Sequence, residues 1–380
     1  MKLNQIATVL NETIVPNLLG EETTIAADLS NIVDLGVAIE NLTGDEFLNY
    51  AKSFAVGVAR NIMDTRIYTS KYYGLMSDAR EFGGVVQRAK AKNIISAVDM
   101  PIWTLETGTD YFDGVYHGID PDVKIYNLDT AFQIDYSIPH EMYKQYFTSA
   151  DGMTELVSLI ESNVRSSLEV KLEGLAKATL QQLIASAASD RTIHMVTLFN
   201  DTFNPETPLT TATCLHDASF LRFYVEQTLR LRDMLRDINK KYNDGTVPTF
   251  TPDEDLRITM LTEVDKAIVC NMLSDTFHKD LLEIGEYSTI NFWQNASDAI
   301  LPSLGVTAEV KYQGEDDAEP TTIQSVGTVI YDRYSCGVTA RLNKVNAQPI
   351  ARGDFTTFYH NVAESRFVDT RQSAIVLALD

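Results

Sequence analysis

The sequence predicts an α+β fold, and three features of its pattern support this class. Residues 151 to about 187 keep apolar side chains at helical spacing, whereas residues 255–340 alternate β-type runs with one helical run. Residues 66–135 are rich in Tyr, Gly and Asp without a helical period, which is typical of extended ribbons and loops. With 380 residues, 44% of them hydrophobic, the chain has enough apolar content for at least one large core and for two or three domains.

The N-terminal part predicts an arm followed by a helix. Residues 1–42 carry scattered apolar residues such as Ile6, Leu10 and Ile14, with too little periodicity to form a core of their own. We therefore expect an arm that packs on another surface. Thr43 followed three residues later by Glu46 is a capping-box signature, and apolar residues at helical spacing follow it. These features predict a helix over residues 44–64.

The middle of the chain predicts two strands and two helices. Residues 123–126 and 131–138 alternate with period two in places, and Pro139 ends the second strand. The helix over residues 151–187 is on the order of 50 Å long at 1.5 Å per residue. Its stripe consists of Leu156, Ile160, Val164, Leu168, Leu172, Leu175, Leu180 and Leu183. A second helix is expected over residues 218–241, with Asp217 as its N-cap.

The C-terminal part predicts mostly strands. The expected elements are a strand at 256–261, a helix at 264–273, β-type runs at 289–290, 306–312 and 328–331, a surface loop at 314–320, and strands at 355–362 and 373–379.

Composition excludes several classes of protein. The chain has 31 basic and 53 acidic residues and a net charge of −22, which argues against sequence-specific nucleic-acid binding. Its three cysteines are far apart, so we expect neither a disulfide framework nor a metal half-site. The N-terminus lacks the features of a signal peptide and no run of 18 apolar residues occurs, so we expect neither export by the usual route nor insertion in a membrane.

Motifs for catalysis are missing from the sequence. It has no GxGxxG, GxxxxGK[ST], HExxH or GxSxG pattern, and its six histidines stand singly without a second ligand at metal-binding spacing. We therefore predict no catalytic residue, cofactor or metal, and a protein that is not an enzyme. Two of the 53 acidic residues could still act together in hydrolysis, so an acidic cytoplasmic α+β hydrolase remains an alternative.

The order of the predicted elements resembles that of the major capsid protein of tailed double-stranded-DNA bacteriophages, which has the Hong Kong 97-type fold shared with encapsulins. The resemblance is carried by residues 123–126 and 131–141 leading into 154–185, by 255–273, and by 355–359 with 374–379. It implies an N-terminal arm and helix (1–65), an extended β loop (66–122), a peripheral domain with a long spine helix at 151–187 (123–200), an α/β axial domain (201–345) and closing strands of the peripheral domain (346–380).

The resemblance also implies a function. The expected protein is structural and self-assembles through hexamers and pentamers into an icosahedral phage head around double-stranded DNA, which it does not bind sequence-specifically. It would be located in the virion, assemble in the host cytoplasm, and have a scaffolding protein and a portal as partners, with no membrane. An encapsulin-like nanocompartment shell is the alternative within this fold. Some members link a loop lysine covalently to a neighbour's asparagine, but Lys90, Lys92 and Asn361 form no signature for it.

Physical reasoning independently indicates an oligomer. An arm and a two-stranded excursion cannot bury their own apolar surface, so they need another chain. Residues 66–92 hold six basic and two acidic residues, whereas residues 99–141 hold one lysine and nine acidic residues. We hypothesise that the basic ribbon meets an acidic face of a neighbour; alternatively, the charges only solvate two sides of one ribbon. The predicted contact residues are Ile6, Leu10, Ile14, Arg80, Arg88, Lys90 and Lys92.

Overall fold

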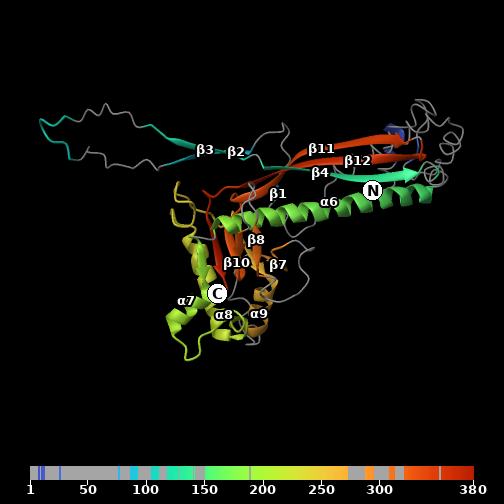
Figure 1. Cartoon of the computed structure of the whole chain (residues 1–380). Coiled ribbons are helices and arrows are strands. Elements are labelled where there is room, and N and C mark those ends of the chain that lie inside the picture. The colour runs from blue at the N-terminus through green and yellow to red at the C-terminus, as the bar shows by residue number, and fades with distance from the viewer. Residues whose placement is uncertain are drawn as a thin grey trace. The chain divides into compact units, whose positions relative to one another are not determined.

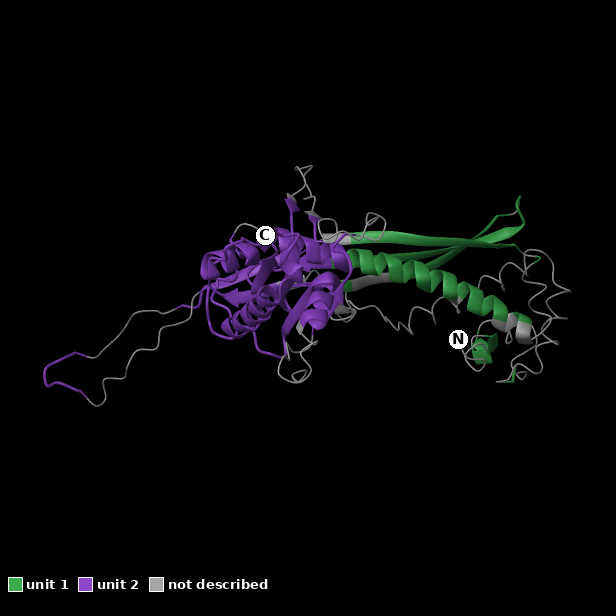
Figure 2. Cartoon of the chain, turned by 90° about the horizontal axis from the view of Figure 1, so that it is seen from below, with its two compact units in different colours: residues 1–84, 129–175, 339–365 green, residues 85–128, 176–338, 366–380 purple. Residues whose placement is uncertain are grey.

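A computed structural model provides the structure of the chain. It describes residues 7–8, 10–12, 25–26, 76–77, 86–92, 104–110, 118–126, 128–139, 141, 150–187, 190–272, 287–294, 308–312, 321–350 and 352–380. The chain divides into two compact units (Figure 2). Unit 1 comprises residues 1–84, 129–175 and 339–365, and unit 2 comprises residues 85–128, 176–338 and 366–380. The expected helix at 44–64 and the loop at 314–320 lie outside the described residues.

Unit 1 contains most residues of each strand of a four-stranded sheet. The strand order is β1-β11-β12-β4. The bounds are Met76–Ser77 for β1, Leu128–Pro139 for β4, Cys336–Ile350 for β11 and Phe355–Val368 for β12. Residues 130–138 of β4 alternate in exposure, as the period-two pattern predicted. Strand β11 was not predicted, because its Lys, Asn and Gln residues are unfavourable in strands and gave no signal.

Helix α6 spans Ala150–Ala187 and is the longest described helix of the chain (Figure 1). Its bounds confirm the prediction from the leucine-rich stripe, and every member of that stripe is at most 7% exposed. Residues up to Leu175 belong to unit 1 and residues from Ala176 belong to unit 2. The helix forms because its apolar residues recur every three or four positions, which gives a buried face, and no residue from 172 to 187 is exposed.

Unit 2 is built on a five-stranded sheet with the order β5-β13-β10-β6-β7. Strand β13 is antiparallel to β10 and parallel to β5, and β6 is antiparallel to β10 and parallel to β7. Both β10 and β13 are buried at every residue, as expected for strands covered on both faces. The bounds are Thr192–His194 for β5, Leu256–Leu261 for β6, Tyr287–Ile290 for β7, Val326–Asp332 for β10 and Ala374–Ala378 for β13.

The last two strands of the chain lie in different sheets. Strand β12 belongs to the four-stranded sheet, whereas β13 lies next to β10 in the five-stranded sheet. The side chains of β13 explain why it lies in the five-stranded sheet. Strand β13 is a continuous apolar run, Ala-Ile-Val-Leu-Ala, which is stable only inside a sheet covered on both faces.

Helices and two small ribbons complete the described part of unit 2. Aromatic side chains pack between α7 and α8, with the rings of Phe199 and Phe220 5.6 Å apart. Tyr224 of α8 donates a 2.7 Å hydrogen bond to Thr328 of β10, and a Cβ at Gly327 would lie 2.8 Å from the Tyr224 hydroxyl. The bounds are Val86–Ala91 for β2, Pro121–Tyr126 for β3, Met195–Phe203 for α7, Cys214–His216 for η3, Ala218–Met234 for α8, Thr262–Met272 for α9, Val310–Tyr312 for β8 and Thr321–Ile323 for β9.

Helix α8 begins as predicted but ends earlier. The side chain of Asp217 accepts a 2.8 Å hydrogen bond from the backbone N–H of Phe220, which confirms it as the N-cap. The helix ends at Met234 rather than at residue 241. The side-chain amide of Asn239 donates to the backbone carbonyls of Met234 and Asp237, so it satisfies helix-end acceptors and turns the chain away. Helix α7 was not predicted.

Candidate functional site

The ribbon formed by β2 and β3 is the most unusual feature of unit 2. The two strands pair antiparallel, with Arg88 opposite Lys124 and Lys90 opposite Asp122. Successive residues of β3 alternate between exposed and half-buried. The half-buried positions are the polar ones, whereas Val123 and Ile125 are 45% and 65% exposed. The ribbon therefore turns its charged face toward its own unit and its apolar face outward, which reverses the usual arrangement of an amphipathic strand.

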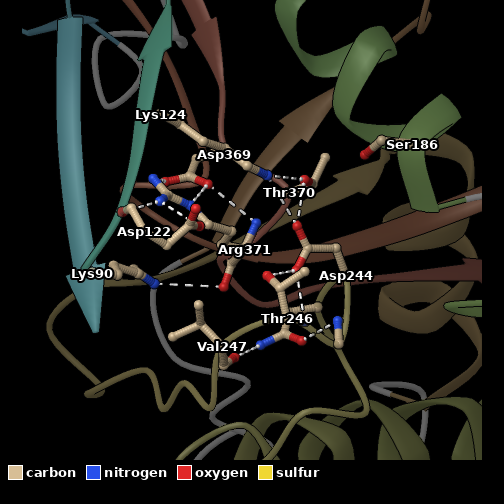
Figure 3. A network of polar contacts seen from close by, with 12 residues as sticks. Lys90, Asp122, Lys124, Ser186, Asp244, Thr246, Val247, Asp369, Thr370 and Arg371 are labelled. Carbon is tan, nitrogen blue, oxygen red and sulfur yellow. Dashed lines mark hydrogen bonds and ion pairs between the residues drawn. The ribbon is translucent and has the colours of Figure 1, made fainter. Parts of the chain in front are cut away.

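A buried arginine holds the charged face of the ribbon (Figure 3). Arg371 lies in the turn between β12 and β13, and its side chain is 0% exposed. Its Nε and Nη2 donate to the two carboxylate oxygens of Asp369 at 2.9 and 3.0 Å. Its Nη1 donates to the Asp122 carboxylate at 3.0 Å and to the Asp122 carbonyl at 2.9 Å, and Nη2 also donates to the Arg88 carbonyl at 3.2 Å. All five N–H groups of the guanidinium are therefore used.

The Arg371 guanidinium determines the charge state of its neighbours. Burial alone would raise the pKa of Asp369, whose side chain is 0% exposed, but hydrogen bonds from Arg371 outweigh burial and hold this pKa below its ordinary value. Burial also acts to lower the pKa of Arg371, but Asp369 and Asp122 raise it above its ordinary value. The ion pair therefore remains charged at neutral pH, and it joins the ribbon to the turn that leads into β13.

A second polar cluster holds the ribbon at Lys124 (Figure 3). The Lys124 ammonium lies 3.1 Å from the Asp244 carboxylate, which also accepts a 2.9 Å hydrogen bond from the Thr370 hydroxyl. The other Asp244 oxygen accepts from the N–H and hydroxyl of Thr246. Burial would raise the pKa of Asp244, but these hydrogen bonds lower it to about 2. Asp244 therefore connects the ribbon to the loop that follows α8.

Three of the predicted contact residues lie on this ribbon. The Arg88 guanidinium lies over the Phe367 ring at 4.6 Å and donates to the carbonyl of Tyr334. Lys90 donates to the Gln372 side chain at 2.8 Å, and burial lowers the pKa of Lys90. The Lys92 ammonium lies 3.1 Å from the Asp120 carboxylate. The side chains of Lys92 and Asp120 are 49% and 63% exposed, so their pairing adds little stability.

The structure thus places Arg88 and Lys90 against their own chain. Their charged groups have partners within unit 2, and the hypothesis that these residues reach an acidic face of a neighbour stays a prediction. The Arg-Ala-Lys-Ala-Lys pattern of residues 88–92 was the available signal, since period-two charges lie on one face of a strand. Sequence reasoning missed Asp369, Arg371 and Asp244, because nothing local relates them to the ribbon.

The remaining predicted contact residues lie in the N-terminal part of the chain. Leu10 is 0% exposed within this single chain, and its contact with a neighbour stays a prediction. Next to it, the Asn11 side chain pairs with the backbone of Ile25, donating at 3.0 Å and accepting at 2.7 Å. These hydrogen bonds hold together two parts of the arm itself. Ile6, Ile14 and Arg80 lie outside the described residues.

Among the described residues, no three His, Cys, Asp or Glu side chains gather in a way that could hold a metal ion. None of the described helices is both long enough and apolar enough to cross a membrane. What the arrangement provides is a ribbon that is fixed at its base by ion pairs and that displays an apolar face.

Comparison with known proteins identifies relatives of the chain. Residues 14–378 match the family model described as Phi29-like phage major capsid protein. The chain is similar to the capsid structure of Staphylococcus phage Andhra, at 10% identity and a TM-score of 0.53, over 83% of this chain and 86% of that one. It is also similar to a chain in a structure of the head fiber and inner core protein gp22 of native bacteriophage P68, at 12% identity and a TM-score of 0.50, over 80% and 83% of the two chains. A search of curated proteins finds no match.

Proposed function

The chain belongs to the Phi29-like phage major capsid protein family, and we propose that its copies assemble as hexamers and pentamers into an icosahedral head around double-stranded DNA. It is a structural phage capsid protein that self-assembles and resides in the virion, and its fold is of the Hong Kong 97 type. The family is not a class of enzymes, so the hydrolase alternative is not favoured, and neither is the encapsulin alternative.

The observation that carries this proposal is the reversed ribbon β2–β3. Its polar face is held by the ion pairs of Arg371 and Lys124. Its outward face presents Val123 and Ile125, together with Ile119, which is 67% exposed just before the ribbon. A two-stranded ribbon with a bare apolar face is at best marginally stable unless another surface covers that face. A neighbouring copy in a shell provides such a surface.

We propose a domain assignment that uses the two units as a guide. We assign unit 1, with its four-stranded sheet and the first part of α6, to the peripheral domain, and residues 176–338 of unit 2 to the axial domain. The extended loop is residues 66–122, of which the structure describes 76–77, 86–92, 104–110 and 118–122. Residues 1–65 remain the arm and its helix, with Ile6 and Ile14 as contacts to neighbours. Arg80 and Lys92 are the basic loop residues that we assign to neighbour contacts.

The partners and the place of assembly follow from the family. We expect a separate scaffolding protein and a portal as partners of the growing shell, which would assemble in the host cytoplasm. The DNA would be enclosed without sequence-specific contacts, because a chain with net charge −22 lacks the excess of cations that such binding needs.

The proposal is tested by producing the full-length chain together with the scaffolding protein of its phage and viewing the product by negative-stain microscopy. We expect closed particles of uniform size, and double-stranded DNA inside particles from infected cells. Particles that instead enclose a protein cargo would indicate a nanocompartment. Only soluble subunits, under conditions where the scaffolding protein itself is present and folded, would contradict the proposal.

The contribution of the ribbon is tested by a surface variant. Val123→Asp combined with Ile125→Asp should abolish closed particles while leaving the unfolding of the free subunit unchanged, because both side chains are already exposed there. Leu198→Asp is the matched control, since Leu198 is an exposed apolar residue on α7. Normal particle yield from the double variant would remove the ribbon from the contact.

A further inference from the structure

Arg191 is a buried arginine whose guanidinium is only half used. It follows the C-terminal end of α6 and is 6% exposed. Its Nη2 donates a 2.6 Å hydrogen bond to the carbonyl of Ser186 in the last turn of the helix, and its backbone N–H donates to the Ala187 carbonyl at 3.0 Å. The Nη1 group is buried as well, but it has no hydrogen-bond partner among the described residues. Arg191 therefore caps α6 with one side of its guanidinium and leaves the other side unsatisfied.

A buried charged donor without an acceptor is unfavourable, so any state in which an acceptor reaches Nη1 is stabilised relative to one in which none does. Burial lowers the pKa of Arg191, whereas the charges of Asp244 and Asp190 act to raise it. Asp190 is exposed and therefore hydrated, whereas the Asp244 side chain is only 20% exposed. Asp244 is thus the acidic group that loses the least hydration by pairing with Nη1.

Backbone pairing along β13 places Arg191 beside the segment that carries Asp244. The N–H of Ala374 donates to the Tyr242 carbonyl at 2.9 Å, and the N–H of Val376 donates to the Arg191 carbonyl at 3.0 Å. Because alternate N–H groups of a strand point to the same edge, these two carbonyls lie on one edge of β13, about 7 Å apart. Asp244 follows Tyr242 by two residues, which puts its carboxylate in the neighbourhood of Arg191 and agrees with the effect of its charge on the pKa of Arg191.

In this structure the Asp244 carboxylate serves the ribbon instead (Figure 3). One of its oxygens lies 3.1 Å from the Lys124 ammonium and accepts a 2.9 Å hydrogen bond from the Thr370 hydroxyl. The Lys124 side chain is 37% exposed, so water can solvate its ammonium when Asp244 leaves. The two cations next to Asp244 therefore differ, because Lys124 can be hydrated whereas the buried Nη1 of Arg191 cannot.

We propose that Asp244 is a two-position switch between the ribbon and the end of α6. In the first position, which the structure shows, its carboxylate pairs with Lys124 and Nη1 of Arg191 has no acceptor. In the second position Lys124 is in water, and the Asp244 carboxylate accepts a hydrogen bond from Nη1. Loss of the Lys124 pair is then partly offset by the satisfied Arg191, so release of the ribbon at Lys124 fixes the last turn of α6. The switch lies within unit 2 and goes beyond the proposed function, because it operates in a single subunit.

Hydrogen exchange of the free, full-length subunit tests the switch. Lys124→Met removes the cation of the first position, so the Arg191 amide should gain at least threefold in protection while the ladder amides of β2 and β3 lose protection. The matched control is Lys92→Met, which removes an exposed ion pair with Asp120 on the same ribbon and should leave the Arg191 amide unchanged. No gain in Lys124→Met, or an equal gain in Lys92→Met, would overturn the switch.

Two double variants assign the gain to the pairing of Asp244 with Arg191. Adding Asp244→Asn to Lys124→Met should abolish the gain in protection, because the amide carries no charge to meet the guanidinium. Adding Asp190→Asn instead should leave the gain in place. A gain that persists with Asp244→Asn, or one that disappears with Asp190→Asn, would overturn the switch. All these measurements use the free subunit, so failure of the chain to form particles would contradict the proposed function and leave this result unaffected.

Discussion

Replacing Arg371 with methionine should be among the most damaging single changes at the base of the ribbon. The substitution keeps most of the buried volume but removes all five guanidinium hydrogen bonds. Asp369, which is 0% exposed, then keeps the 3.1 Å hydrogen bond from the backbone N–H of residue 371 but loses its cationic partner. Removing one partner of a buried ion pair costs about 3–5 kcal/mol, because the other charge is left uncompensated.

Most of this cost belongs to Asp369 rather than to Asp122. The Asp122 side chain is 23% exposed, so water can replace part of what it loses, whereas Asp369 has no such access. Adding Asp369→Asn to Arg371→Met removes the stranded charge and should recover roughly 1–3 kcal/mol of unfolding free energy. The two substitutions should therefore be strongly non-additive.

Urea unfolding of the unassembled subunit provides the assay, with hydrogen exchange of the β2 and β3 ladder amides as a local readout. The ladder amides of Arg371→Met should lose protection earlier than those of the five-stranded sheet. Arg333→Met is the matched control, because Arg333 is exposed, and it should change the unfolding free energy by less than about 0.5 kcal/mol. A cost below about 1 kcal/mol for Arg371→Met, or simple additivity with Asp369→Asn, would refute the reasoning.

Three further predictions follow from the polar groups. The pKa of Asp244 is about 2, below its value in the unfolded chain. The stabilisation that the ionised Asp244 carboxylate provides is therefore complete above about pH 4 and is lost as pH falls toward 2. With solvent screening taken into account, Asp244→Asn should cost about 1 kcal/mol of unfolding free energy at pH 7 and nothing at pH 2. His360 is 0% exposed and burial lowers its pKa to about 4, so the folded state binds its proton less well than the unfolded state does. Stability should therefore fall by about 3 kcal/mol between pH 6.5 and 4, and His360→Phe should remove this loss in unfolding curves at the two pH values. Finally, the subunit of mature particles should run at its chain mass of 42.4 kDa on a denaturing gel; a ladder of multimers would instead implicate Lys90, Lys92 and Asn361 in covalent linkage.

The sequence by itself determined the elements whose signal is local. The stripe of α6 predicts its bounds, because every third or fourth residue along 38 positions is apolar and becomes buried. The cap at Asp217 and the apolar run of β13 were likewise evident in short windows. Strand β11 and the end of α8 were not, because they depend on pairing with a distant strand and on the side chain of Asn239.

Only the tertiary structure decided which face of the ribbon is buried. Period two shows that the charged and apolar residues of β3 lie on opposite faces, and an isolated strand of this kind would be expected to bury Val123 and Ile125. The structure reverses this because Arg371 donates hydrogen bonds to Asp122 and to the Arg88 carbonyl, which lie 249 and 283 positions away in the sequence. No local pattern encodes such a partnership. Because Arg371 is buried with two carboxylates, the hydrogen bonds of the ribbon's polar face are satisfied within the subunit. The apolar face then stays exposed for the proposed contact with another copy.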